Sequence, residues 1–109
     1  MQVLLIEDNE DDVLLIKEQL AASHEGSVEL EHANRLATGL ERLARGGIEV
    51  VLTDLHLPDS QALDTFDQVY AKANGIPVIV VTGTYQEGAI ALEAIKRGAQ
   101  DYVVKEELS

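Results

Sequence analysis

The alternation of short strand-forming runs with longer helical patterns is the feature that most limits how this chain can fold. Runs rich in Val, Ile, Leu and Tyr recur along the sequence at Val3–Ile6, Val28–His32, Val50–Thr53, Val78–Thr82 and Tyr102–Val104. The third and fourth runs are almost continuously apolar, which is typical of strands that are covered on both faces. Strands that alternate with helices in this way predict a parallel sheet with right-handed crossovers and helices on both faces.

Apolar residues between these runs recur at helical spacing and predict four amphipathic helices. The stripes are Val13, Ile16 and Leu20; Leu36, Leu40 and Leu43; Leu63, Phe66 and Tyr70; and Ala91, Leu92 and Ile95. The last three stripes are followed by residues that commonly end helices, namely Gly46-Gly47, Asn74-Gly75 and Gly98. With 109 residues and a hydrophobic content of 46%, the chain is expected to form one globular domain.

The net charge of −12 limits the kinds of molecule that this domain is expected to bind. Nucleic acid binding needs Lys and Arg at phosphates, so we expect no direct nucleic acid binding by this domain. An acidic surface favours a metal ion or a basic protein surface instead. The absence of Cys excludes disulfides and thiolate metal sites and suits a reducing cytoplasm. No apolar run could span a bilayer and no signal peptide is evident, so a cytoplasmic protein without membrane contact is expected.

Polar residues follow four of the five expected strands at the point where each strand ends. They are Glu7 and Asp8, Asp54, Thr82, and Lys105. The carboxyl ends of parallel strands share one edge of the sheet, and ligands bind at that edge. The sequence therefore predicts that carboxylates, a hydroxyl and an ammonium converge on one site.

The acidic stretch LLIEDNEDDV, which begins at Leu4, combines two features. Carboxylates held close together repel one another and raise each other's pKa, and a hard cation such as Mg²⁺ relieves this repulsion. We therefore interpret Glu7 and Asp8, at the strand end, as part of a Mg²⁺ site. Glu10, Asp11 and Asp12 are interpreted as a solvated first helical turn, which the helix dipole favours.

The order and spacing of these motifs resemble the receiver domain of two-component response regulators, the CheY-like family. The resemblance runs from Val3 to Lys105 and rests on Glu7-Asp8, Asp54 with Pro58 four residues later, Thr82-Gly83, Tyr102 and Lys105. It implies a flavodoxin-like, doubly wound α/β fold with a five-stranded parallel sheet of order 2-1-3-4-5. Residues 1–109 would form one receiver domain that ends before the family's usual last helix.

The resemblance also implies the chemistry of the site. Asp54 would take a phosphoryl group from a phosphohistidine as an aspartyl phosphate. Asp8, Asp54 and the backbone carbonyl of His56 would bind Mg²⁺ directly, and Glu7 would bind it directly or through a water. Lys105 and the metal would neutralise the charge of the transferring group.

A switch is implied by two further residues. Thr82 would bind a phosphoryl oxygen, and Tyr102 would then turn inward and alter the surface formed by the fourth helix and the fifth strand. The side chains of His56 and Thr84 either tune hydrolysis of the acyl phosphate or point to solvent, and the sequence leaves both alternatives open. His24 and His32 lack a partner at metal-ligand spacing and are expected at surface or strand positions.

The implied function is that of a phosphorelay receiver, whose partners are a histidine kinase or phosphotransfer protein and an unknown effector. Such a domain catalyses only its own phosphorylation and dephosphorylation. The main alternative is a phospho-independent, receiver-like interaction module. An aspartate-nucleophile phosphohydrolase would need a second Asp at the position of His56. A flavodoxin relative would need a glycine- and hydroxyl-rich phosphate loop after the first strand, where this chain is acidic.

Some positions depart from the family pattern. Ala62 stands where Gly is usual, and only four residues follow Lys105, so the fifth helix is expected to be absent or reduced to one turn. Its absence would open apolar surface on the first and fifth strands. The candidates are Leu4, Ile6, Val103 and Val104, and the sequence leaves open which of each alternating pair is exposed. We expect that face to pack against a second copy of the chain or against residues beyond Ser109, although a small open patch would be tolerated.

Overall fold

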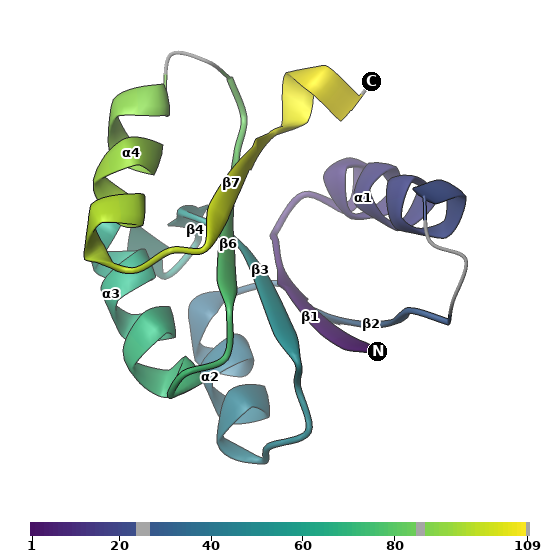
Figure 1. Ribbon diagram of the computed structural model, residues 1–109, viewed down its shortest axis with the longest axis horizontal. Coiled ribbons are helices and arrows are strands. Elements are labelled where there is room, and N and C mark those ends of the chain that lie inside the picture. The colour runs from purple at the N-terminus through teal and green to yellow at the C-terminus, as the bar shows by residue number, and fades with distance from the viewer. Residues whose placement is uncertain (24–26, 85–86, 109) are drawn as a thin grey trace.

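The computed structural model describes residues 1–23, 27–84 and 87–108, and a five-stranded parallel sheet forms its centre. The strands are β1 (Gln2–Ile6), β2 (Glu29–Ala33), β3 (Val50–Asp54), β6 (Val78–Thr82) and β7 (Asp101–Val104). Their order is β2-β1-β3-β6-β7 (Figure 1), which confirms the predicted order and the α/β fold class. Each strand lies within one residue of the run that predicted it.

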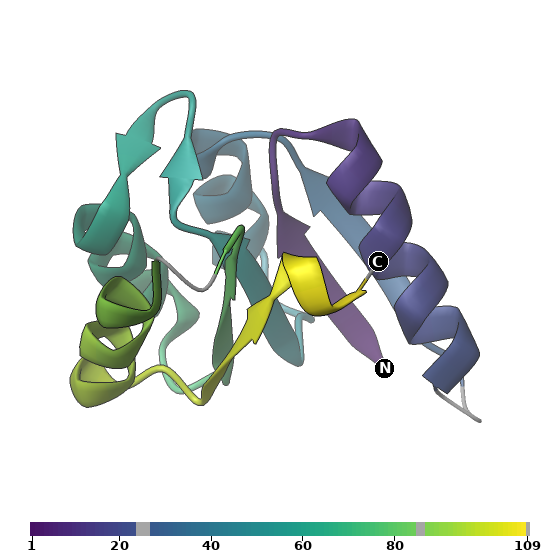
Figure 2. The same cartoon turned by 90° about the horizontal axis from the view of Figure 1, so that it is seen from above.

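Helices cover both faces of the sheet, as the alternation predicted. They are α1 (Glu10–Ser23), α2 (Leu36–Ala44), α3 (Ala62–Ala73) and α4 (Gly88–Arg97). Figures 1 and 2 show α1 on one side of the sheet and α2, α3 and α4 on the other. The helices in the described ranges are all too short or too polar to cross a membrane.

The period-two alternation of β1 divides the core into two layers. Leu4 and Ile6 point to the α2–α4 side and pack in a cluster around Phe66. Val3 and Leu5 point to the α1 side and pack with Val13 and similar residues. β1 therefore contributes side chains to both layers, which explains why it is apolar at every position from 3 to 6.

Two of the helical stripes were assigned to the wrong residues. Leu92 and Ile95 are 56% and 36% exposed, whereas Ala91 and Ala94 are fully buried in α4. Likewise Tyr70 is 44% exposed on α3, although Phe66 is buried. The buried alanines of α4 and the partly buried Ile90 meet the core, whereas Leu92 and Ile95 remain outside, so apolarity alone did not locate the buried face.

The chain beyond β7 forms a single 3₁₀ turn, η2 (Lys105–Leu108), within the described residues. This confirms the expectation that a fifth helix is absent or truncated. The Leu108 side chain packs on the α1-side core, and its carbonyl accepts a hydrogen bond from Gln19 Nε2 at 2.9 Å.

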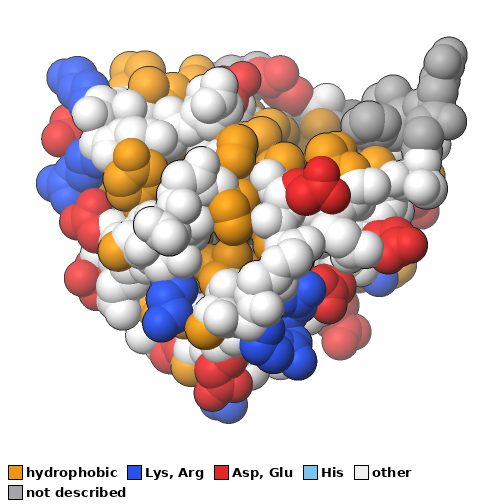
Figure 3. All heavy atoms as spheres, turned by 60° about the horizontal axis from the view of Figure 1, so that its bottom comes forward, with side chains coloured by type: hydrophobic (Ala, Val, Ile, Leu, Met, Phe, Trp, Pro, Cys, Tyr) orange, Lys and Arg blue, Asp and Glu red, His pale blue; other side chains and the backbone are white. Residues whose placement is uncertain are grey.

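The two candidates for open apolar surface on β1 were wrong, whereas of the two on β7 Val103 is partly open and Val104 is buried. Leu4, Ile6 and Val104 are 1%, 0% and 5% exposed, because Leu4 and Ile6 face the side that α2–α4 covers. On the α1 side, Val50 and Ile79 are only partly buried. Val103 is also partly buried, and it pairs in register with Val81 of that layer. Figure 3 shows hydrophobic side chains gathered in the middle of one face of the molecule.

A short antiparallel hairpin follows β3 and was not predicted. It consists of β4 (His56–Leu57) and β5 (Ser60–Gln61). Asp59 at its tip accepts hydrogen bonds from the backbone N–H groups of Leu36 and Ala37, at 2.8 and 3.0 Å, and so caps α2 from a distant part of the chain. The hairpin thereby fixes the loop that follows Asp54.

Candidate functional site

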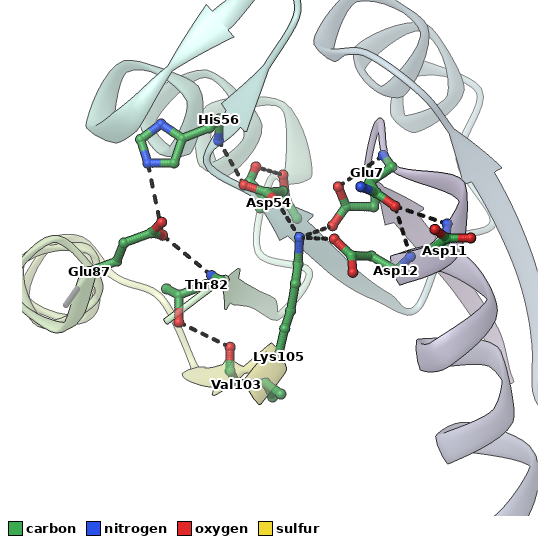
Figure 4. A network of polar contacts seen from close by, with 12 residues as sticks. Glu7, Asp11, Asp12, Asp54, His56, Thr82, Glu87, Val103 and Lys105 are labelled. Atoms are coloured by element: carbon green, nitrogen blue, oxygen red, sulfur yellow. Dashed lines mark hydrogen bonds and ion pairs between the residues drawn. The ribbon is translucent and has the colours of Figure 1, made fainter. Parts of the chain in front are cut away.

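Asp54 ends β3 and lies at the centre of a polar network at the carboxyl edge of the sheet (Figure 4). Its side chain is largely buried, since the residue is 7% exposed. One oxygen, Oδ2, accepts a hydrogen bond from Lys105 Nζ at 2.7 Å. The other, Oδ1, accepts one from the His56 backbone N–H at 2.8 Å. Asp54 is therefore oriented at both oxygens by neighbouring donors.

Lys105 follows β7 and reaches across the edge of the sheet to a group of carboxylates. Its Nζ lies 2.5 Å from Glu7 Oε1, 2.8 Å from Asp12 Oδ2 and 2.7 Å from Asp54 Oδ2. Burial by itself would lower the pKa of this ammonium, but its hydrogen bonds to Asp12, Asp54 and Glu7 outweigh burial and hold the pKa above its ordinary value. Lys105 is therefore a fixed positive charge beside Asp54.

Glu7 is an almost fully buried carboxyl group, with 1% exposure. Burial raises its pKa to about 7; the hydrogen bond from Lys105 opposes this rise, and the neighbouring charge of Asp54 adds to it. Oε2 accepts a hydrogen bond from the Asn9 N–H at 3.2 Å. Near neutral pH the protonated and ionised forms of Glu7 are therefore close in free energy. Lys105 stabilises the ionised form, and a further cation would stabilise it more.

Glu7, Asp8 and Asp54 form a group that could hold a metal ion. Each offers one carboxylate oxygen, and these atoms lie within 4.8 Å of one another. Asp8 is exposed while the other two are buried, so one side of the group is open to water. Oxygen ligands from a few carboxylates together with water are what Mg²⁺ prefers, and the donor set therefore fits that ion. The predicted role of the His56 carbonyl stays a prediction.

The interpretation of Asp12 as merely a solvated residue of the first helical turn is wrong. Asp12 does lie in that turn, where Asn9 Oδ1 accepts hydrogen bonds from the N–H groups of Asp11 and Asp12. However, its carboxylate turns back to bind Lys105 at 2.8 Å. Local spacing in the sequence could not identify this contact, because Lys105 is 93 residues away along the chain and the pairing depends on how α1 packs.

The predicted switch residues lie on β6, which pairs with the strand of Asp54, and on β7, the next strand along. Thr82 is buried, and its hydroxyl donates a long hydrogen bond of 3.4 Å to the Val103 carbonyl. Tyr102 is partly buried and packs against the α2–α4 side of the core. Thr84 is exposed, and its carbonyl accepts a hydrogen bond from the Glu87 N–H at 3.2 Å. Their functional roles stay predictions.

The His56 ring has defined partners. Its Nδ1 lies 2.9 Å from Gln61 Oε1, and its Nε2 lies 3.9 Å from Glu87 Oε2. Glu87 was missed in the sequence because it stands five residues past Thr82, outside the strand-end motif. His32 is an exposed strand residue, as expected, but its Nε2 lies 2.7 Å from the Glu7 carbonyl, a contact that was not foreseen. His24 lies outside the described residues.

Comparison with known proteins decides the family. The sequence profile of the response regulator receiver domain matches residues 3–108. The chain belongs to the response regulator receiver domain family. As a receiver it is similar to the two-component response regulator ORR21 of Oryza sativa subsp. indica, with 29% identity over 105 residues. It is also similar to the regulatory protein AtoC of Escherichia coli, with 32% identity over 102 residues.

Solved structures agree with this family. The bacteriophytochrome response regulator RtBRR superposes with a TM-score of 0.80 at 30% identity, and the match covers 95% of this chain and 68% of that one. The curated relatives are much longer. The match with ORR21 covers 96% of this chain but only 15% of ORR21, and the match with AtoC covers 94% of this chain but only 22% of AtoC.

Proposed function

We propose that this receiver accepts a phosphoryl group on Asp54 from the phosphohistidine of a histidine kinase or a phosphotransfer protein. An Asp54 carboxylate oxygen attacks phosphorus, the new P–O bond forms as the P–N bond to the imidazole breaks, and the departing imidazole takes up a proton from solvent. The observation that carries the proposal is the placement of Asp54 between a buried ammonium at 2.7 Å and two further carboxylates.

Lys105 has a specific task in this proposal. Its ammonium already binds the Asp54 oxygen that would become part of the aspartyl phosphate, and it neutralises part of the negative charge that the phosphoryl group brings. Glu7, Asp8 and Asp54 would hold Mg²⁺ together with the His56 carbonyl, and the bound ion would supply the remaining charge neutralisation.

Thr82 and Tyr102 would convert phosphorylation into a change of surface. The hydrogen bond from Thr82 to the Val103 carbonyl is long, at 3.4 Å, so little is lost when the hydroxyl turns to a phosphoryl oxygen. Tyr102 would then turn inward and change the surface of α4 and β7 that an effector recognises. We propose a cytoplasmic switch that catalyses only its own phosphorylation and dephosphorylation.

Phosphorylation by acetyl phosphate tests the metal requirement. In Mg²⁺ the intact mass should rise by one phosphoryl group. In excess EDTA this gain should be reduced at least tenfold, because the carboxylates of Glu7, Asp8 and Asp54 then repel the incoming phosphoryl group. Full phosphorylation in EDTA would contradict the metal requirement. If no labile phosphoryl group is gained in either buffer, the alternative of a phospho-independent interaction module gains support.

A further inference from the structure

Glu87 immediately precedes α4, and its side chain reaches back across the end of β6. Its Oε2 accepts a hydrogen bond from the Gly83 backbone N–H at 3.4 Å and lies 3.9 Å from His56 Nε2. Its Oε1 lies 3.6 Å from where a Cβ on Gly83 would be. The carboxylate is thus held against the end of the strand, and Figure 4 shows it across the site from Lys105.

The groups that Glu87 contacts lie at the same edge of the sheet as Asp54. Asp54 pairs in register with Val81, so Gly83 follows closely at the same edge of the sheet. The His56 backbone N–H already donates to Asp54 Oδ1. A phosphoryl group brings three strong acceptor oxygens and negative charge. On the side away from Lys105, a phosphoryl group on Asp54 would meet the Gly83 N–H, a donor that Glu87 now occupies, and the His56 ring, which Glu87 faces at 3.9 Å.

We propose that Glu87 is an internal competitor of the phosphoryl group. Its carboxylate holds the Gly83 N–H and faces His56 in the unphosphorylated receiver, and it gives up both when Asp54 is phosphorylated. Two anions share one N–H only against their mutual repulsion, so Glu87 opposes entry of the phosphoryl group. This inference rests on the proposed function of Asp54.

The position of Glu87 gives the displacement a consequence for the fold. Glu87 flanks the first residue of α4, so its side chain links the end of β6 to the start of that helix, and displacement breaks this link. This path from Asp54 to α4 is separate from the one through Thr82 and Tyr102. The Glu87 N–H binds the Thr84 carbonyl at 3.2 Å, and this hydrogen bond does not involve the side chain. Side-chain variants at position 87 therefore retain its donor.

The experiment compares Glu87→Gln and Glu87→Ala with wild type and with Glu93→Gln. Glu93 lies on α4 itself, its side chain is 44% exposed and it faces Arg97 at 3.7 Å, so Glu93→Gln makes the same change in charge as Glu87→Gln away from the site. Two quantities are measured: the dissociation constant of beryllofluoride with Mg²⁺, and the initial rate of phosphorylation by acetyl phosphate. Loss of the competitor should tighten binding and raise the rate about two- to tenfold, which is the range for one hydrogen bond. The gain in affinity and in rate should be larger for Glu87→Ala than for Glu87→Gln, and Glu93→Gln should match wild type in both.

A second readout does not depend on phosphorylation. In the free protein the amide ¹H resonance of Gly83 should move in Glu87→Gln and stay in place in Glu93→Gln. Unchanged or weakened beryllofluoride binding in both Glu87 variants, or an equal effect in Glu93→Gln, overturns the proposal even if wild type is phosphorylated. If wild type takes up neither beryllofluoride nor a phosphoryl group, the proposed function itself fails, and the competitor role fails with it.

Discussion

At the scale of single residues, burial decides how the charges of the site behave. Glu7 has 1% exposure and a pKa raised to about 7 by burial, whereas Asp8, one residue later, is exposed. The sequence identified both as acidic residues at a strand end, but it could not distinguish the buried one from the exposed one. It also could not show that Asp12 and Glu87 turn toward the site, because each lies on a neighbouring element whose orientation depends on packing.

The raised pKa of Glu7 predicts a pH-dependent stability in metal-free protein. Because the folded-state pKa lies above the ordinary value of 4.5, folding favours the protonated form. The contribution of Glu7 is therefore complete below about pH 4.5 and is lost as pH rises through about 7. Relative to Glu7→Gln, wild type should lose a few kcal/mol of unfolding free energy between these values, at about 1.4 kcal/mol for each pKa unit.

Urea unfolding of both proteins in EDTA at several pH values measures this difference. Addition of Mg²⁺ should reduce the loss for wild type and leave Glu7→Gln little changed, since the amide is a poorer ligand for the ion. Parallel pH profiles for the two proteins in EDTA would show that Glu7 is not the titrating group.

At the scale of elements, periodicity located strands and helices but not every face or turn. The apolar runs of β3 and β6 were correctly recognised as buried strands, and Gly46, Asn74 and Gly98 do lie just past helix ends with φ values of 77°, 50° and 126°. The β4–β5 hairpin was missed because its contacts are with distant elements, as the hydrogen bonds from the α2 backbone to Asp59 show.

The backbone conformation of Ala62 lowers the stability of the folded protein. It stands where the family usually has Gly, and its φ is 53°, a left-handed conformation that is unfavourable for a residue with a Cβ. Ala62→Gly should therefore raise the free energy of unfolding by roughly 0.5–1 kcal/mol.

The matched control is Ala71→Gly, at an exposed position inside α3. There glycine has no conformational advantage, and the same change should lower stability by about 1 kcal/mol. Thermal or urea melting of both variants measures the pair. A drop in stability for Ala62→Gly as large as that of the control would contradict the strain at position 62.

At the scale of the whole molecule, the two faces of the sheet are covered unequally. The α2–α4 side is sealed by three helices, whereas the α1 side leaves Val50, Ile79 and Val103 partly buried beside a single 3₁₀ turn. The sequence predicted this imbalance but placed Leu4 and Ile6 on the wrong face. The direction of alternation in β1 depends on its neighbours, and either register satisfies the apolar pattern.

This unequal cover predicts that the 109-residue chain self-associates through the α1 side of the sheet. Apolar side chains left partly open there would be buried against a second copy. Sedimentation should show a dimer whose population rises with concentration, and Val103→Lys should shift it toward monomer. Leu92→Lys, on the exposed surface of α4, should not. A chain that sediments as a monomer at every concentration would contradict the prediction.

The most direct measurement of the central claim is the intact mass of wild type and Asp54→Asn after incubation with acetyl phosphate and Mg²⁺. The amide is nearly isosteric with the carboxylate but is a poor nucleophile. Wild type should gain one phosphoryl group, hydroxylamine should remove it as expected of an acyl phosphate, and Asp54→Asn should gain none. An Asp54→Asn protein that gains the same hydroxylamine-labile group would show that another carboxylate is the acceptor and would contradict the account.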